Sequence, residues 1–74
     1  MQAREILLKL NEEKIKAYQI FIDKVEELYL RGMEYQHIWL ELWILKSDFS
    51  SYRTGKKIPS LQKLRECNEK LKKL

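Results

Sequence analysis

The side chains of this chain that are best suited to chemistry are lysines and arginines, and they are concentrated in its last 29 residues. Residues 46–74 contain nine Lys or Arg against three Asp or Glu, a net charge of +6, whereas residues 1–45 contain six against eight, a net charge of −2. Cationic groups gathered in this way are typical of a surface that binds nucleic acid. A lysine-rich helix that is merely solvated would give the same asymmetry, and charge alone does not separate the two.

Other reactive side chains are few. His37 has no Cys or second His near it in the sequence, so we expect a surface or phosphate contact rather than a metal site. Cys67 is the only cysteine, which excludes a disulfide within the chain and agrees with a reducing cytoplasm. No Ser/His/Asp arrangement, carboxylate pair or Gly-rich phosphate loop can be assembled. We therefore expect no enzymatic activity, no cofactor and no small-molecule substrate.

The size and composition of the chain predict one small helical domain. Seventy-four residues leave no room for a second core. Hydrophobic residues make up 45% of the chain and charged residues 35%, with only two Gly and one Pro to interrupt helices. The N-terminus is charged from its start and no apolar stretch approaches the roughly 20 residues of a membrane helix. We therefore expect neither a signal peptide nor a membrane span, and a location in the cytoplasm.

The first third of the chain has the apolar periodicity of a helix. Residues 3–31 place apolar side chains at steps of three and four residues, with Lys and Glu between them. Asn11 is a good N-cap, and Leu10 and Ile15 have the spacing of a hydrophobic staple around it. This favours two helices that meet near Asn11, with one continuous helix of almost 30 residues as the alternative. Gly32 ends the segment.

Two short helices follow. Residues 34–42 form a helix with Ile38 on its buried side, and residues 45–53 form a helix that directs Phe49 and Tyr52 inward. The outward side chains of the second short helix are Lys46, Ser47, Ser50, Ser51 and Arg53.

A turn at residues 54–59 then leads to the last helix. Gly55 permits positive φ and Pro59 stops propagation, so the chain turns there. Ser60 can cap a helix over residues 61–73. The apolar line of that helix is Leu61, Leu64, Cys67, Leu71 and Leu74. The predicted fold is all-α, a compact bundle of about five helices without strands.

The two short helices are separated by only two or three residues, a link too short to return the chain antiparallel. The helices therefore cross steeply, which is the geometry of a helix-turn-helix. Residues 32–64 resemble the lambda-repressor-like (phage repressor/Cro-type) family. GMEYQHI at 32–38 resembles the family opening "Gly-Leu-Thr-Gln-x-x-Leu", and GKKIPSLQKL at 55–64 resembles its tail "Gly-Lys-x-x-Pro-Ser-Leu-x-x-Leu". The spacing between the two motifs matches without an insertion.

This resemblance implies a single helix-turn-helix domain over residues 1–74. N-terminal helices would occupy residues 1–31, the helix-turn-helix and its following turn residues 33–60, and a C-terminal helix residues 61–74. The implied function is sequence-specific binding of double-stranded DNA by a small transcriptional regulator, repressor-like, of a bacterium, phage or mobile element. It implies a homodimer on two half-sites about one helical turn apart.

The resemblance also assigns roles to side chains. The helix at 45–53 would read bases in the major groove, and positions around it would contact phosphates. The implied base contacts are Lys46, Ser47, Asp48, Ser50 and Ser51. The implied phosphate contacts are Tyr35, Gln36, Arg53, Lys56 and Lys57.

Two tryptophans depart from the family pattern. Trp39 stands where the family has a small Ala at a helix contact, and Trp43 where it has a Gly with positive φ. Because Trp disfavours positive φ, we expect the turn to differ locally. The alternative function is a helical protein-interaction module that dimerises or binds a partner through Trp39 and Trp43, without binding DNA.

Overall fold

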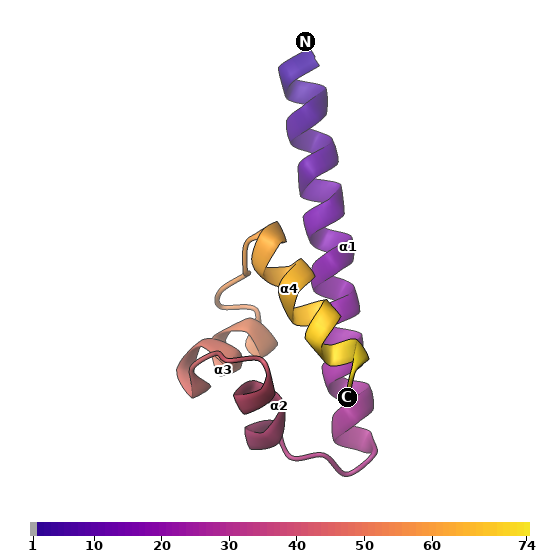
Figure 1. The fold of residues 1–74 in the computed structure, drawn as a ribbon. Coiled ribbons are helices and arrows are strands. Elements are labelled where there is room, and N and C mark those ends of the chain that lie inside the picture. Colours follow the sequence, from indigo (N-terminus) through magenta and orange to yellow (C-terminus); the bar gives the residue numbers. More distant parts are fainter. Residues whose placement is uncertain (1) are drawn as a thin grey trace.

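The computed structural model describes the backbone of residues 2–74 and the side chains of residues 11–74. Over this range helices are the only regular secondary structure, without a strand, and the all-α prediction is confirmed (Figure 1). There are four helices rather than about five. They are α1 (Gln2–Leu30), α2 (Tyr35–Glu41), α3 (Lys46–Thr54) and α4 (Leu61–Lys72).

The helix α1 runs without a break, so the favoured division near Asn11 is wrong and the continuous alternative is correct. Asn11 is an exposed position within this helix. An Asn inside a helix costs only about 0.7 kcal/mol relative to Ala. Breaking the helix would leave several backbone groups without their partners. The capping preference of one residue is therefore too small to divide a segment whose apolar periodicity continues on both sides.

The C-terminus of α1 is closed by Gly32, as predicted. Gly32 adopts φ +99°, its N–H donates to the Tyr29 carbonyl (3.0 Å), and the Met33 N–H donates to the Leu28 carbonyl (3.0 Å). These are the two bonds of a Schellman motif, which needs a left-handed residue after the helix.

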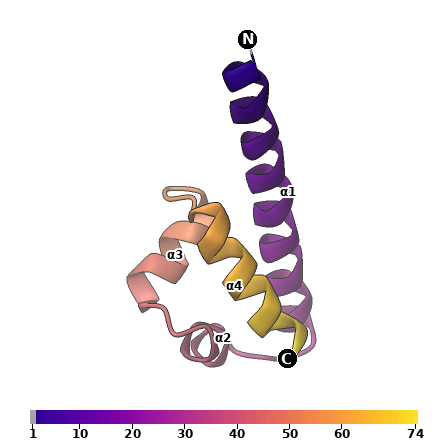
Figure 2. The same cartoon turned by 45° about the horizontal axis from the view of Figure 1, so that its top comes forward.

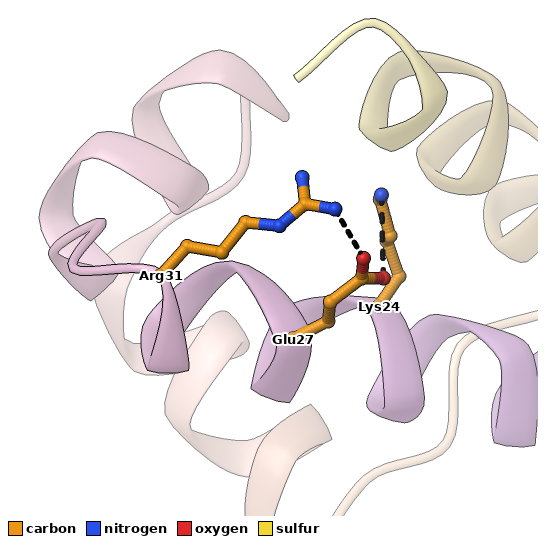
Figure 3. A network of polar contacts seen from close by, with 3 residues as sticks. All are labelled: Lys24, Glu27 and Arg31. Atoms are coloured by element: carbon orange, nitrogen blue, oxygen red, sulfur yellow. Dashed lines mark hydrogen bonds and ion pairs between the residues drawn. The ribbon is translucent and has the colours of Figure 1, made fainter.

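An exposed ion-pair network lies on the last turns of α1. The Glu27 carboxylate accepts from Arg31 Nη2 (2.6 Å) and from Lys24 Nζ (3.4 Å) (Figure 3). Exposed pairs of this kind contribute at most about 1 kcal/mol each.

The core forms where the second half of α1 packs against α4, with α2 and α3 closing one side (Figures 1 and 2). The first half of α1 extends beyond the other three helices in both views. The buried side chains that form the hydrophobic core are Phe21, Val25, Leu28, Ile38, Leu42, Ile44, Phe49, Leu64, Cys67 and Leu71. Three part-buried polar contacts join the elements: the Tyr18 hydroxyl donates to the Tyr52 carbonyl, Asn68 Nδ2 to the Ala17 carbonyl (3.1 Å) and Lys70 Nζ to the Leu42 carbonyl (3.5 Å).

The predicted C-terminal helix is confirmed. Ser60 Oγ accepts from the Lys63 N–H (3.3 Å), which satisfies one of the free donors at the start of α4. Leu64, Cys67 and Leu71 of its predicted apolar line are buried. None of the four helices has both the length and the apolar composition needed to cross a membrane.

Candidate nucleic-acid interface

The link between α2 and α3 is a second Schellman motif, with Trp43 in the position that Gly32 occupies after α1. The Trp43 N–H donates to the Leu40 carbonyl and the Ile44 N–H to the Trp39 carbonyl, both at 3.2 Å. Trp43 adopts φ +59°. The expectation that the turn would differ locally is therefore wrong for the backbone at Trp43, which adopts the positive φ in spite of its side chain. The two hydrogen bonds and the burial of Ile44 hold the backbone in a conformation that costs a non-glycine residue about 1–2 kcal/mol.

This link gives α2 and α3 very different directions. Figure 2 looks almost along the axis of α2, whereas α3 runs across the view. The chain therefore turns steeply between the two short helices, as the length of the link predicts. One face of α3 remains open to solvent while Phe49, on the other face, is buried in the core.

The open face of α3 is lined by short hydroxyl side chains. Ser47, Ser50 and Thr54 are all exposed, and their spacing of three and four residues places them on one side of the helix. Thr54 Oγ1 donates to the Ser50 carbonyl (2.8 Å). Thr54 was not among the predicted site residues because the helix was expected to end at residue 53. Its distance of four residues from Ser50 was the signal that could have identified it.

Cationic and aromatic side chains border this face on the side of α2. The Arg53 guanidinium lies over the Tyr35 ring, 4.6 Å from its centroid. The same ring stacks on Tyr29, with centroids 4.5 Å apart and planes at 17°. A hollow of about 120 Å³ opens beside them. Its lining residues are Tyr35, Trp39, Lys46, Phe49, Ser50 and Arg53. The fold thus brings together Lys46, Ser50 and Arg53 with Tyr35.

The opposite border of α3 carries an ion pair. Lys57 Nζ lies 3.6 Å from the Asp48 carboxylate, and the Lys57 N–H donates to the Ser51 carbonyl (3.2 Å). Asp48 lies in the first turn of α3, where the helix dipole favours a negative charge. Asp48 and Ser51 are half-buried, so of the five predicted base contacts these two are the less accessible.

The remaining predicted contacts lie on the periphery. Gln36 is exposed in the first turn of α2, and Lys56 is exposed in the turn after α3. Residues 46–57 carry four cations against one anion, a net charge of +3. The site is therefore defined by charge and shape.

The other candidate side chains lie elsewhere. His37 Nε2 is 3.7 Å from the Glu41 carboxylate on the surface of α2, and the described residues contain no group of three potential metal ligands. Cys67 is 1% exposed, which confirms it as a core residue. Burial raises the pKa of its thiol, against the opposing effect of Lys63 and Lys70.

The two tryptophans have different environments. Trp39 is half-buried and packs against the core, whereas Trp43 is 84% exposed. They therefore do not form one surface in which both indoles are equally available.

Comparison of the chain with protein-family models, curated proteins and solved structures finds no match in any of the three. The likeness to lambda-repressor-like proteins therefore rests on the residues quoted above.

Proposed function

We propose that α2, its turn and α3 form a helix-turn-helix with which this protein binds double-stranded DNA in the major groove, without enzymatic activity. The observation that carries the proposal is the open face of α3. It combines exposed hydroxyls with cations on both borders, while the opposite face of the same helix is buried at Phe49. A helix of nine residues with one exposed face, within a stretch of net charge +3 over residues 46–57, suits the width and the negative potential of the groove.

The short side chains have a clear use in this geometry. Ser47 and Ser50 allow the backbone of α3 to approach the floor of the groove closely, and their hydroxyls can both donate and accept. Lys46, in the first turn, can donate to guanine O6 or N7. A serine hydroxyl can hydrogen-bond to any base and therefore discriminates little between sequences. Lys46 is thus the residue that we expect to contribute most to sequence preference.

Cations around the helix supply most of the affinity in this proposal. Arg53, Lys56 and Lys57 neutralise phosphates that flank the groove. To do so, Lys57 exchanges its exposed pair with Asp48 for a phosphate, which costs little because such a pair is worth at most about 1 kcal/mol.

The experiment that tests the proposal is binding of a mixed pool of genomic duplex fragments, measured at several salt concentrations. With four cations engaged, the logarithm of the association constant should fall against the logarithm of salt with a slope of about −3 to −4. Lys56→Ala should reduce this slope by about 1. Lys16→Ala, a matched change at an exposed lysine of α1, should leave it unchanged.

Two outcomes would reject the proposal. The first is no binding even at low salt. The second is an equal loss for Lys56→Ala and Lys16→Ala, which would mean that the positive charge acts without a defined surface. If binding occurs, Lys46→Ala should change the preferred sequence, whereas Lys57→Ala should weaken all sequences alike.

A second candidate function is protein interaction through the exposed indole of Trp43. Trp43 is 84% exposed, with Leu40 at 55% and Leu45 at 68% beside it in the sequence, and the chain holds the indole there in spite of an unfavourable φ. Self-association measured by sedimentation equilibrium tests this candidate. Dimerisation of the parent that is lost in Trp43→Gly would favour it. A monomeric parent at high concentration would count against it.

A further inference from the structure

The most specific arrangement of charged and aromatic groups in the described residues is a stack of three side chains, each from a different part of the chain. Tyr29 lies on the last turn of α1, Tyr35 begins α2, and Arg53 lies on the last turn of α3. The Tyr29 ring centroid lies 4.5 Å and the Arg53 guanidinium carbon 4.6 Å from the Tyr35 ring centroid, so both side chains pack against that ring. The Tyr35 ring is also tilted against buried Phe49, with centroids 5.7 Å apart. The aromatic part of the stack is therefore fixed by the core.

This stack determines what Arg53 can do. The Arg53 guanidinium carbon lies 4.6 Å from the Tyr35 ring centroid, and a guanidinium held over a ring can keep N–H donors for a further partner. Among the described residues Arg53 has no ion pair with a carboxylate, unlike Arg31 and Arg65, which pair with Glu27 and Glu13. The cation is thus held in place by an aromatic platform while its hydrogen-bonding edge is available.

The free edge of Arg53 borders the hollow between α2 and α3. The volume of the hollow is about 120 Å³, which equals the volume that roughly four water molecules occupy in liquid water. Lys46 adds a second cation to its lining and Ser50 adds a hydroxyl. The side chains of Lys46, Ser50 and Arg53 can all donate to an anion, and no carboxylate contributes to the lining.

We propose that this hollow binds one phosphate group of the DNA backbone and that Tyr35 is the residue that positions Arg53 to bind it. The proposal deepens the proposed function and rests on it for the source of the phosphate. It changes the role of Tyr35 from a phosphate contact to a positioning residue.

Conservative variants distinguish the positioning of Arg53 by Tyr35 from the effect of the Arg53 charge alone. Arg53→Lys keeps the charge but loses the planar stack, and Tyr35→Leu keeps an apolar side chain but loses the ring. Each should weaken DNA binding by about two- to fivefold, the effect of an exposed cation–π contact. Tyr35→Phe should bind like the parent. Arg65→Lys, at an exposed arginine of α4 without an aromatic partner, is the matched control and should also bind like the parent.

Two further readouts distinguish positioning from a general loss of structure. The double variant Tyr35→Leu/Arg53→Lys should bind no more weakly than either single variant, because both changes remove the same contact. Tyr35→Leu should keep the parent's salt slope, because Arg53 keeps its charge, whereas Arg53→Gln should reduce the slope by about 1. Arg53 is exposed, so its variants test the subsite even if Tyr35→Leu fails to fold.

An NMR titration with inorganic phosphate, followed at the Arg53 Nε–H resonance, tests the phosphate-binding hollow (the subsite) independently of the proposed binding of DNA. An equal shift in the parent and in Tyr35→Phe, with about two- to fivefold more phosphate needed to saturate it in Tyr35→Leu, supports the subsite even if no DNA binds, in which case only the proposed function fails. DNA binding with additive losses in the double variant, or with Arg53→Lys equal to the parent, overturns the subsite and leaves the proposed function intact.

Discussion

The conformation of Trp43 leads to a prediction in which glycine is the better residue. Trp43 has φ +59° at the end of α2, at the position of a Schellman motif where Gly32 stands after α1. We predict that Trp43→Gly is more stable than Trp43→Ala. Both variants remove the same indole, so its contacts cancel in the comparison. What remains is the backbone preference of the two residues for a left-handed conformation.

The magnitude follows from two opposing effects. A residue with a Cβ pays about 1–2 kcal/mol in the left-handed region, which glycine avoids. Glycine loses about 0.5–1 kcal/mol more than alanine through chain entropy on folding. The difference favours Trp43→Gly by about 0.5–1 kcal/mol. For a chain of 74 residues this corresponds to a Tm higher by roughly 2–8 °C.

The assay is urea and thermal unfolding followed by far-ultraviolet circular dichroism, with Leu40 as the matched control. Leu40 lies in α2, three residues before Trp43, and is 55% exposed. At this helical position the order should reverse, with Leu40→Ala more stable than Leu40→Gly by about 1 kcal/mol or less. Equal stability of the two Trp43 variants, or a more stable alanine variant, would refute the argument that strain is held at this turn.

Two other predictions concern α4. Ser60→Ala should lower the free energy of unfolding by about 1 kcal/mol, because the Lys63 N–H loses its acceptor. Ser60→Asp should restore the cap. An unchanged urea midpoint in Ser60→Ala would show that the cap does not contribute to stability. Burial raises the pKa of the Cys67 thiol above the ordinary value of 9.0, so as pH rises the thiol loses its proton in the unfolded chain before it does in the folded chain. The thiol's contribution to stability is then complete below pH 9.0 and declines as pH rises through the folded pKa. The urea midpoint should therefore fall less steeply above pH 9.0 in Cys67→Ala than in the parent, and parallel declines would contradict the assignment.

Local signals in the sequence predicted most of the helix boundaries. Gly32 ends α1, Gly55 follows α3 with φ +82°, and Ser60 caps α4. Each acts within one turn of its own position, through a positive φ or a side-chain bond to a nearby N–H. The buried positions Phe49, Leu64 and Leu71 were also predictable, because helical periodicity alone separates an inner from an outer face.

The errors at Asn11 and Trp43 have a common cause. At both positions a local preference of at most about 2 kcal/mol is opposed by a larger sum of interactions. At Asn11 the opposing terms are the hydrogen bonds of an unbroken helix. At Trp43 they are the two turn hydrogen bonds and the burial of Leu42 and Ile44 on either side.

The sequence by itself determined where the hydroxyls and cations of the candidate interface lie along the chain and which face of α3 they share. Only the tertiary structure decided that Arg53 lies on Tyr35, that Tyr35 lies on Tyr29, and that a hollow opens beside them. These contacts join side chains from three different helices. Their formation depends on how α1, α2 and α3 pack around a shared core, which periodicity within one helix does not specify.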